Sequence, residues 1–351
     1  NSKVGSYILN MLNPTMSYQS GDVRRIPLPE ILFERKTELQ IAFMRLVELS
    51  SLDWRYSEIS MTFQVPPLFS IEKVKDSLKS TYFKLRSQWQ SMIDEMKRLE
   101  EENNKIFVEA YGLEDELTPE VPLKEITLTC NPYYRYDSKK SPEQLETLLK
   151  ADTMREFISY AVGCMFGRYS LDKSGLILAN QGEMLEDYLQ QVPNPSFMPD
   201  DDNVIPVLDG NWFTDDIAER FQSFLKTSFG EENYEENLAY IESAIGKDIR
   251  KYFIKDFYND HIKRYKKRPI YWMFSSAKGS FNALVYMHRY RSDTVSTILN
   301  GYLREYKSKL SSKINQLETV ETSVDSSQAQ KTRALKDTES MRKIIKELDE
   351  Y

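Results

Sequence analysis

Apolar residues recur at helical spacing in the first third of the chain. Between residues 30 and 104 they follow the three- and four-residue steps that favour amphipathic helices, at Ile31, Leu32, Ile41, Ala42, Met44, Leu46, Val47 and Leu49. The Pro66-Pro67 pair interrupts this pattern, because proline has no backbone N–H for a helix. A second long helix is predicted to begin near residue 70 and to continue to 102, with a charged face that is typical of solvent exposure.

The stretch from Thr294 to the C-terminus is also predicted to be helical, with a break at residues 325–327. Before the break, apolar side chains alternate three- and four-residue steps, the period of a coiled-coil seam, at Leu299, Leu303, Tyr306, Leu310, Ile314 and Leu317. A second stripe follows the break at Leu335, Met341, Ile345 and Leu348. The two stripes predict an antiparallel helical hairpin.

These patterns divide the chain into four regions. Residues 1–29 are broken by prolines into short extended pieces and read as a linker, 30–105 are helical, 106–292 mix strands, turns and helices, and 293–351 form the hairpin. The fold class that we expect is α+β and mostly helical, with a mixed α+β domain followed by the C-terminal antiparallel hairpin.

Composition excludes several classes of protein. With 351 residues and 40% hydrophobic content the chain can bury a sizeable core, and no window approaches the ~20 apolar residues that a membrane helix needs. We therefore expect no membrane partner and a cytoplasmic location. The start at Asn1-Ser2-Lys3-Val4 has no leader-like pattern, and we interpret the chain as a fragment.

Cysteine and histidine are scarce. Cys130 and Cys164 are too few for a disulfide scaffold, and we expect both to be ordinary buried thiols. Together with His261 and His288 they include no close pair of the kind that binds zinc, so no metal site is predicted from them.

Charge is distributed unevenly. The net charge of −7 argues against a nucleic-acid binder, but residues 261–291 contain no Asp or Glu. This basic window carries Lys263, Arg264, Lys266, Lys267, Arg268, Lys278, His288, Arg289 and Arg291. Cations this dense repel one another unless a polyanion compensates them, so these nine residues are the candidate DNA-binding set.

The aromatic residues inside the window have a structural explanation. Residues 269–274 form the apolar run of a buried strand, so Trp272, Phe274 and Tyr286 are expected in the core.

Three other patterns suggest chemistry but have simpler explanations. Asn131-Pro132-Tyr133-Tyr134 resembles the loop with which amino-methyltransferases hold a flipped base, yet it lacks a second proline and fits a surface turn. Gly163 and Gly167 enclose Cys-Met-Phe, which indicates packing and not a cofactor cradle. The acids from Asp200 to Asp216 could hold Mg²⁺ in a nuclease, but a polar loop before a helix capped by Thr214 is favoured.

Several long, ordered motifs between residue 10 and about residue 306 resemble the C-terminal part of the PglX family. They are Leu52-Asp53-Trp54 with Pro66-Pro67-Leu68, Tyr111-Gly112-Leu113, Glu116-Leu117-Thr118-Pro119-Glu120, the stretch from Ser159 to Asp172, Lys267-Arg268-Pro269-Ile270-Tyr271-Trp272 and Tyr286-Met287-His288-Arg289-Tyr290. These are the adenine-specific DNA methyltransferases of bacterial BREX phage-defence systems.

The resemblance implies an upstream S-adenosylmethionine-dependent domain, of which residues 1–29 would be the end, followed by target recognition on double-stranded DNA. Neither a cofactor loop nor a catalytic loop is found here, so we expect no cofactor, no catalytic residues and no activity in this segment. The alternative is a protein-interaction scaffold that docks other BREX proteins.

Overall fold

The computed structural model describes residues 2–15, 17–70, 77–136, 139–323 and 326–350. The chain forms two compact units, Asn1–Glu72 with Ser80–Thr153 and Lys73–Lys79 with Met154–Tyr351. Helices dominate the described residues, and the strands found there form one three-stranded antiparallel sheet. The expected α+β, mostly helical class is therefore confirmed.

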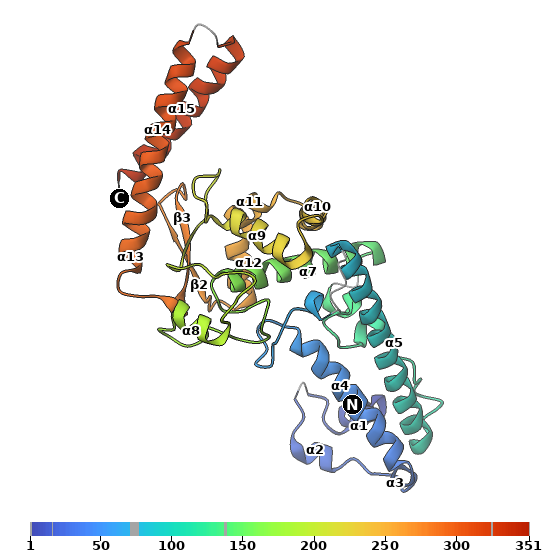
Figure 1. Cartoon of the computed structure of the whole chain (residues 1–351). Coiled ribbons are helices and arrows are strands. Elements are labelled where there is room, and N and C mark those ends of the chain that lie inside the picture. Colours follow the sequence, from blue (N-terminus) through green and yellow to red (C-terminus); the bar gives the residue numbers. More distant parts are fainter. Residues whose placement is uncertain (1, 16, 71–76, 137–138, 324–325, 351) are drawn as a thin grey trace. The chain divides into compact units, whose positions relative to one another are not determined.

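The first unit is helical. It contains α1 (Lys3–Leu12), α2 (Ser20–Arg24), α3 (Ile31–Glu34), α4 (Lys36–Arg55), η1 (Pro67–Phe69), η2 (Leu123–Glu125), α6 (Pro132–Arg135), most of α5 (Leu78–Tyr111) and the first half of α7 (Pro142–Met165) (Figure 1). The predicted start of the second long helix falls partly on residues outside the described ones. Residues 3–12, for which extended pieces were expected, form a helix because Ser2 caps it and no proline interrupts it.

Two polar contacts connect α4 to other parts of the first unit. Arg45 of α4 makes a two-pronged ion pair with Glu95 of α5, with both N–O distances at 2.8 Å. The buried carboxylate of Asp53 accepts hydrogen bonds from the backbone N–H groups of Thr129 and Cys130, at 2.6 and 3.1 Å. These contacts fix the inner face of α4, because a fork of this kind constrains orientation as well as distance.

The second unit combines the sheet with helices. Its elements are α8 (Leu185–Gln191), β1 (Val204–Pro206), α9 (Ile217–Phe229), α10 (Tyr234–Ile245), α11 (Ile249–Tyr252), η3 (Phe253–Phe257), α12 (Tyr258–Arg264), β2 (Tyr271–Ser275), β3 (Asn282–Tyr286), η4 (Met287–Arg289), α13 (Thr294–Thr297), η5 (Ile298–Leu303), α14 (Arg304–Thr322) and α15 (Gln328–Leu348).

The strand order is β1-β3-β2, so the apolar strand β3 is central and β2 lies at an edge. Tyr286 on β3 is buried as expected, and Phe274 is partly buried against the core. The prediction for Trp272 is wrong, because its side chain is 48% exposed. An apolar run on an edge strand does not require burial of every side chain: Tyr271 is buried, and the neighbouring Trp272 points to the opposite face of the sheet.

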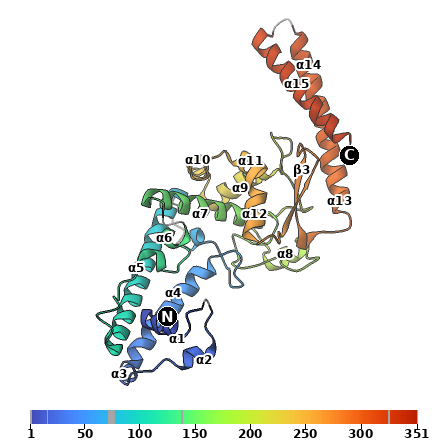
Figure 2. The ribbon, with the colours of Figure 1, turned by 180° about the vertical axis from the view of Figure 1, so that it is seen from behind.

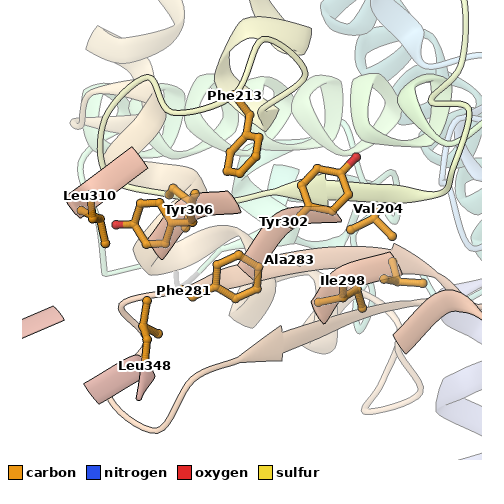
Figure 3. Packing of buried hydrophobic residues seen from close by; sticks show 11 residues of the cluster. Val204, Phe213, Phe281, Ala283, Ile298, Tyr302, Tyr306, Leu310 and Leu348 are labelled. Atoms are coloured by element: carbon orange, nitrogen blue, oxygen red, sulfur yellow. The ribbon is translucent and has the colours of Figure 1, made fainter. Parts of the chain in front are cut away.

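The predicted helical hairpin is present, with α14 and α15 lying side by side in both views (Figures 1 and 2). Its base belongs to the main core of the second unit. In Figure 3, Tyr306 and Leu310 of α14 and Leu348 of α15 lie in one cluster with Phe281 and Phe213. The hairpin is therefore anchored by the same cluster that packs one face of the sheet.

The register of the seam differs from the predicted one in its first turn and near its far end. Segment η5 is a π-helix, whose extra residue per turn brings Ile298 and Tyr302 into the core and leaves Leu299 37% exposed. On α15, Leu335 is 49% exposed, while the smaller Ala334 and Thr338 are buried in its place. The predicted positions Leu310, Ile314 and Leu348 are buried.

The seam gives a stability prediction. Leu310 is fully buried in α14, so Leu310→Ala is expected to lower the free energy of unfolding of the second unit by about 2–5 kcal/mol, the usual cost of a core truncation. The matched control is Leu335→Ala on the exposed side of α15, which should change little. Urea unfolding measures both, and equal stability of the two variants would contradict the seam.

Candidate nucleic-acid interface

Helix α12 ends in a turn that carries most of the basic window. Lys266 and Lys267 both adopt left-handed backbone conformations, with φ of 51° and 65°. The turn closes through a 2.8 Å hydrogen bond from the backbone N–H of Lys267 to the carbonyl of Ile262. Left-handed conformations cost a residue with a side chain of order 1–3 kcal/mol, which glycine would avoid. The fold therefore keeps two lysines where glycine would be less strained.

We call Lys263, Arg264, Lys266, Lys267 and Arg268 the basic loop. Lys263 is 80% exposed, with Asp260 as its 4.0 Å neighbour on the preceding turn of α12. Lys266, Lys267 and Arg268 are also exposed, whereas Arg264 is half-buried. The loop therefore presents a dense row of cations to solvent.

His261 fixes the base of this loop, a role that the sequence analysis missed. Its imidazole is buried, and its Nε2 accepts hydrogen bonds from the backbone N–H groups of Ile270 and Tyr271, both at 3.1 Å. The ring also lies between Tyr265 and Tyr271, with both centroid distances at 4.7 Å. One side chain thus joins the end of α12 to the start of β2, and the loop between them is held at both ends.

The other candidates lie elsewhere in the second unit. Lys278 is exposed in the turn between β2 and β3, and Arg291 is 51% exposed beside Asp293. The ring of His288 lies tilted against that of Tyr286, with 4.9 Å between the centroids, and burial together with the nearby Arg168 lowers the pKa of His288. A neutral imidazole donates or accepts hydrogen bonds but adds no charge, so His288 offers DNA little electrostatic attraction.

Arg289 occupies a different environment from the one expected of a DNA-reading arginine. It is only 3% exposed, and its guanidinium donates to three backbone carbonyls, those of Phe166, Asp200 and Asp201, at 3.3, 2.7 and 3.0 Å. These hydrogen bonds engage the guanidinium group inside the protein. Arg289 therefore has a structural role in this fold, and its side chain could contact DNA only after local unfolding.

Residues 131–134, which resemble a methyltransferase loop in sequence, have a structural role. The buried amide of Asn131 donates to the carbonyls of Leu123 and Ile126 at 2.7 and 2.9 Å, and its oxygen accepts from the N–H of Tyr133 at the start of α6. Asn131 thus caps a short helix, although it is buried and not in a surface turn as expected.

Packing also explains the glycine pattern and the two cysteines. A Cβ on Gly163 would lie 2.3 Å from a ring carbon of Tyr169, so only glycine fits there. Cys164, Met165 and Phe166 between the two glycines are buried, as predicted. Cys130 and Cys164 are both buried thiols, which confirms that expectation.

The carboxylates of Asp200, Asp201 and Asp202 lie within 4.8 Å of one another, which a metal could bridge. However, Asp200 and Asp202 both accept the N–H of Val204, and Asp202 also accepts the hydroxyl of Tyr302. Burial raises the pKa of Asp200, and its carboxylate already lies 3.7 Å from the guanidinium of Arg220. The polar-loop interpretation fits these contacts better than a nuclease centre does.

The predicted cap of the following helix is wrong by two residues. Helix α9 begins at Ile217, and its cap is Asp216, which accepts from the N–H groups of Ala218 and Glu219 at 2.9 and 3.0 Å. Arg250 pairs with the same buried carboxylate at 2.8 Å. This ion pair holds Asp216 at the cap, and Thr214 lies outside the helix.

A separate pocket of about 640 Å³ opens in the second unit. Its lining includes the carboxylates of Asp202, Asp215, Glu219 and Glu305, and Lys309, whose ammonium lies 4.1 Å from the ring centre of Phe213. A pocket with this excess of carboxylates repels phosphates, so it is not the candidate DNA surface.

In the described residues, none of the helices is both long and apolar enough to cross a membrane. No family model matches the chain.

Two curated proteins resemble the chain over all of its length. One is the adenine-specific methyltransferase BrxX of Escherichia coli O9:H4 (strain HS), 32% identical over 371 residues, and the other is the adenine-specific methyltransferase PglX of Lacticaseibacillus casei (strain Zhang), 34% identical over 368 residues. The alignments cover 29% and 28% of these relatives, so the chain spans less than a third of their length.

The chain is thus related to adenine-specific methyltransferases. Within that class the resemblance to the PglX family is confirmed, and the chain aligns with one segment of each of these two relatives.

The placement of Arg289 predicts an effect on folding. Arg289→Met removes three hydrogen bonds and leaves buried carbonyls without donors, each costing about 1–3 kcal/mol, so the free energy of unfolding should fall by several kcal/mol. Arg291→Met, at a half-exposed position two residues later, is the control and should have little effect. Urea unfolding of both variants checks this, and a stable Arg289 variant would restore that residue as a candidate for DNA contact.

Proposed function

We propose that this chain is the DNA-binding, target-recognition segment of an adenine-specific DNA methyltransferase of the PglX family. The observation that carries the proposal is the basic loop, which is solvent-exposed, held at its base by His261 and part of a window without Asp or Glu. Duplex DNA carries about one negative charge per 1.7 Å of its axis, and a row of cations matches it.

Within this proposal, residues are assigned by side-chain chemistry. Lys263, Lys266 and Lys267 contact phosphates, since lysine is a compact point charge suited to backbone oxygens. Arg264 and Arg291 lie nearer the bases, because the arginine fork can make two parallel hydrogen bonds to guanine. Arg268 completes the basic loop, Lys278 and His288 are further candidate contacts outside it, and Trp272 adds an exposed aromatic ring beside Tyr271 on β2.

The chemistry itself is assigned to the rest of a longer polypeptide. We propose that S-adenosylmethionine binds and that N6-methylation of adenine takes place outside residues 1–351, since no glycine-rich cofactor turn is found in the chain. By the same resemblance, the enzyme would act in the cytoplasm and mark host DNA within a BREX defence system, with other BREX proteins as further partners.

The basic loop predicts how salt affects DNA binding. Lys266→Gln and Lys267→Gln together should weaken binding to every duplex sequence alike and reduce the log–log salt slope by about two, because each lost phosphate contact removes about one released counterion. Titrations of a random duplex at several salt concentrations, followed by fluorescence anisotropy, measure this slope. The same values for the double variant and the parent protein would contradict the proposal.

Two controls sharpen this experiment. Lys105→Gln removes a 68% exposed cation of α5 outside the window and should leave the slope unchanged. Arg291→Gln should instead weaken the binding free energy by roughly 1–3 kcal/mol on the sequence that the enzyme recognises, and by little on random DNA, as expected for a residue that reads a base. Absence of salt-dependent binding altogether would favour the scaffold alternative.

A further inference from the structure

Exposed hydrophobic side chains are concentrated in a short part of the first unit. Most of the large hydrophobic residues that are exposed in the described chain lie between residues 11 and 61: Met11, Tyr18, Val23, Leu28, Ile31, Phe33, Ile41, Phe43, Met44, Val47, Trp54, Ile59 and Met61. Scattered exposed hydrophobic residues are normal, but a gathering of this kind marks an interaction site.

Helix α4 carries the densest part of this gathering. Its outer face carries Ile41, Phe43, Met44, Val47 and Trp54, which are 45–68% exposed, with polar residues such as Gln40, Glu48 and Ser51 between them. At 100° per residue these five side chains fall on one half of the helix. The opposite half carries Leu49 and Asp53, which are buried, and Arg45, which pairs with Glu95. Helix α4 thus exposes large apolar side chains on the half that faces away from its buried residues, as surfaces that bind a partner commonly do.

We infer that the outer face of α4 packs against another part of the same polypeptide, outside residues 1–351. The two relatives contain enough additional sequence to supply such a partner, because more than two thirds of the length of each lies outside the aligned segment. An apolar face this exposed needs a partner that is always present, since permanent interfaces resemble a divided core whereas transient ones are more polar. A segment of the same chain meets that requirement at any protein concentration.

This inference rests on the longer relatives and not on DNA binding, so the two proposals can fail separately. The basic loop belongs to the second unit and the outer face of α4 to the first. Loss of DNA binding would leave the apolar face unexplained, and loss of the α4 contact would leave the basic loop unaffected.

Photo-cross-linking in the intact polypeptide tests the inference. Phe43 and, in a second variant, Trp54 are replaced by p-benzoylphenylalanine, an aromatic residue that is tolerated at exposed sites. Phe83 of α5, which is 59% exposed outside the gathering, provides the matched control. After irradiation, mass spectrometry of digests identifies the partner peptides, and mixed ¹⁵N-labelled and unlabelled protein distinguishes contacts within one chain from contacts between two copies.

Cross-links from positions 43 and 54 to peptides of the same chain outside residues 1–351 are expected, with none from position 83. Cross-links only within residues 1–351, only between two copies, or equally from position 83 would overturn the inference.

Discussion

The guanidinium of Arg289 determines much of the second unit. Its bonds to the carbonyls of Phe166, Asp200 and Asp201 join the end of α7, the loop before β1 and the segment that follows β3. A backbone bond from Asp200 to Met165 at 2.7 Å reinforces the same junction. Because a buried arginine needs all its donors satisfied, this constraint selects one arrangement of loop and sheet. Strands β1 and β3 then pair, and the core in Figure 3 forms on one of their faces.

This framework explains why cations close together in sequence have different roles. Arg289 is enclosed by carbonyls, whereas Lys266 and Lys267 lie in a strained turn whose base is tied to the edge strand β2 by His261. A loop anchored at both ends loses less conformational entropy on binding than a free one. The lysine side chains remain in water, where a phosphate can replace their hydration. The basic loop is therefore suited to contact a polyanion without rearrangement of the core.

The sequence predicted features that depend on periodicity and failed where tertiary contacts decide. The hairpin followed from its spacing, and Leu310 and Ile314 are buried as expected. The π-helical turn at η5 shifted the first positions of the seam, because a heptad pattern does not report an inserted residue. Arg289 looked like its basic neighbours, since its carbonyl partners are distant in sequence. From the sequence, His261 is considered only as a possible metal ligand. No local sequence signal marks its role as a hydrogen-bond acceptor.

The central claim is that the basic loop lies on DNA, and ultraviolet cross-linking to a 5-iodouracil-substituted duplex at low salt tests it most directly. Mass spectrometry of the nucleotide-bearing peptides identifies the part of the chain in contact. We predict adducts on peptides that contain residues 263–272, with Trp272 as the most photoreactive side chain there. Adducts confined to the hairpin or to the outer face of α4, with none between residues 263 and 291, would contradict the claim.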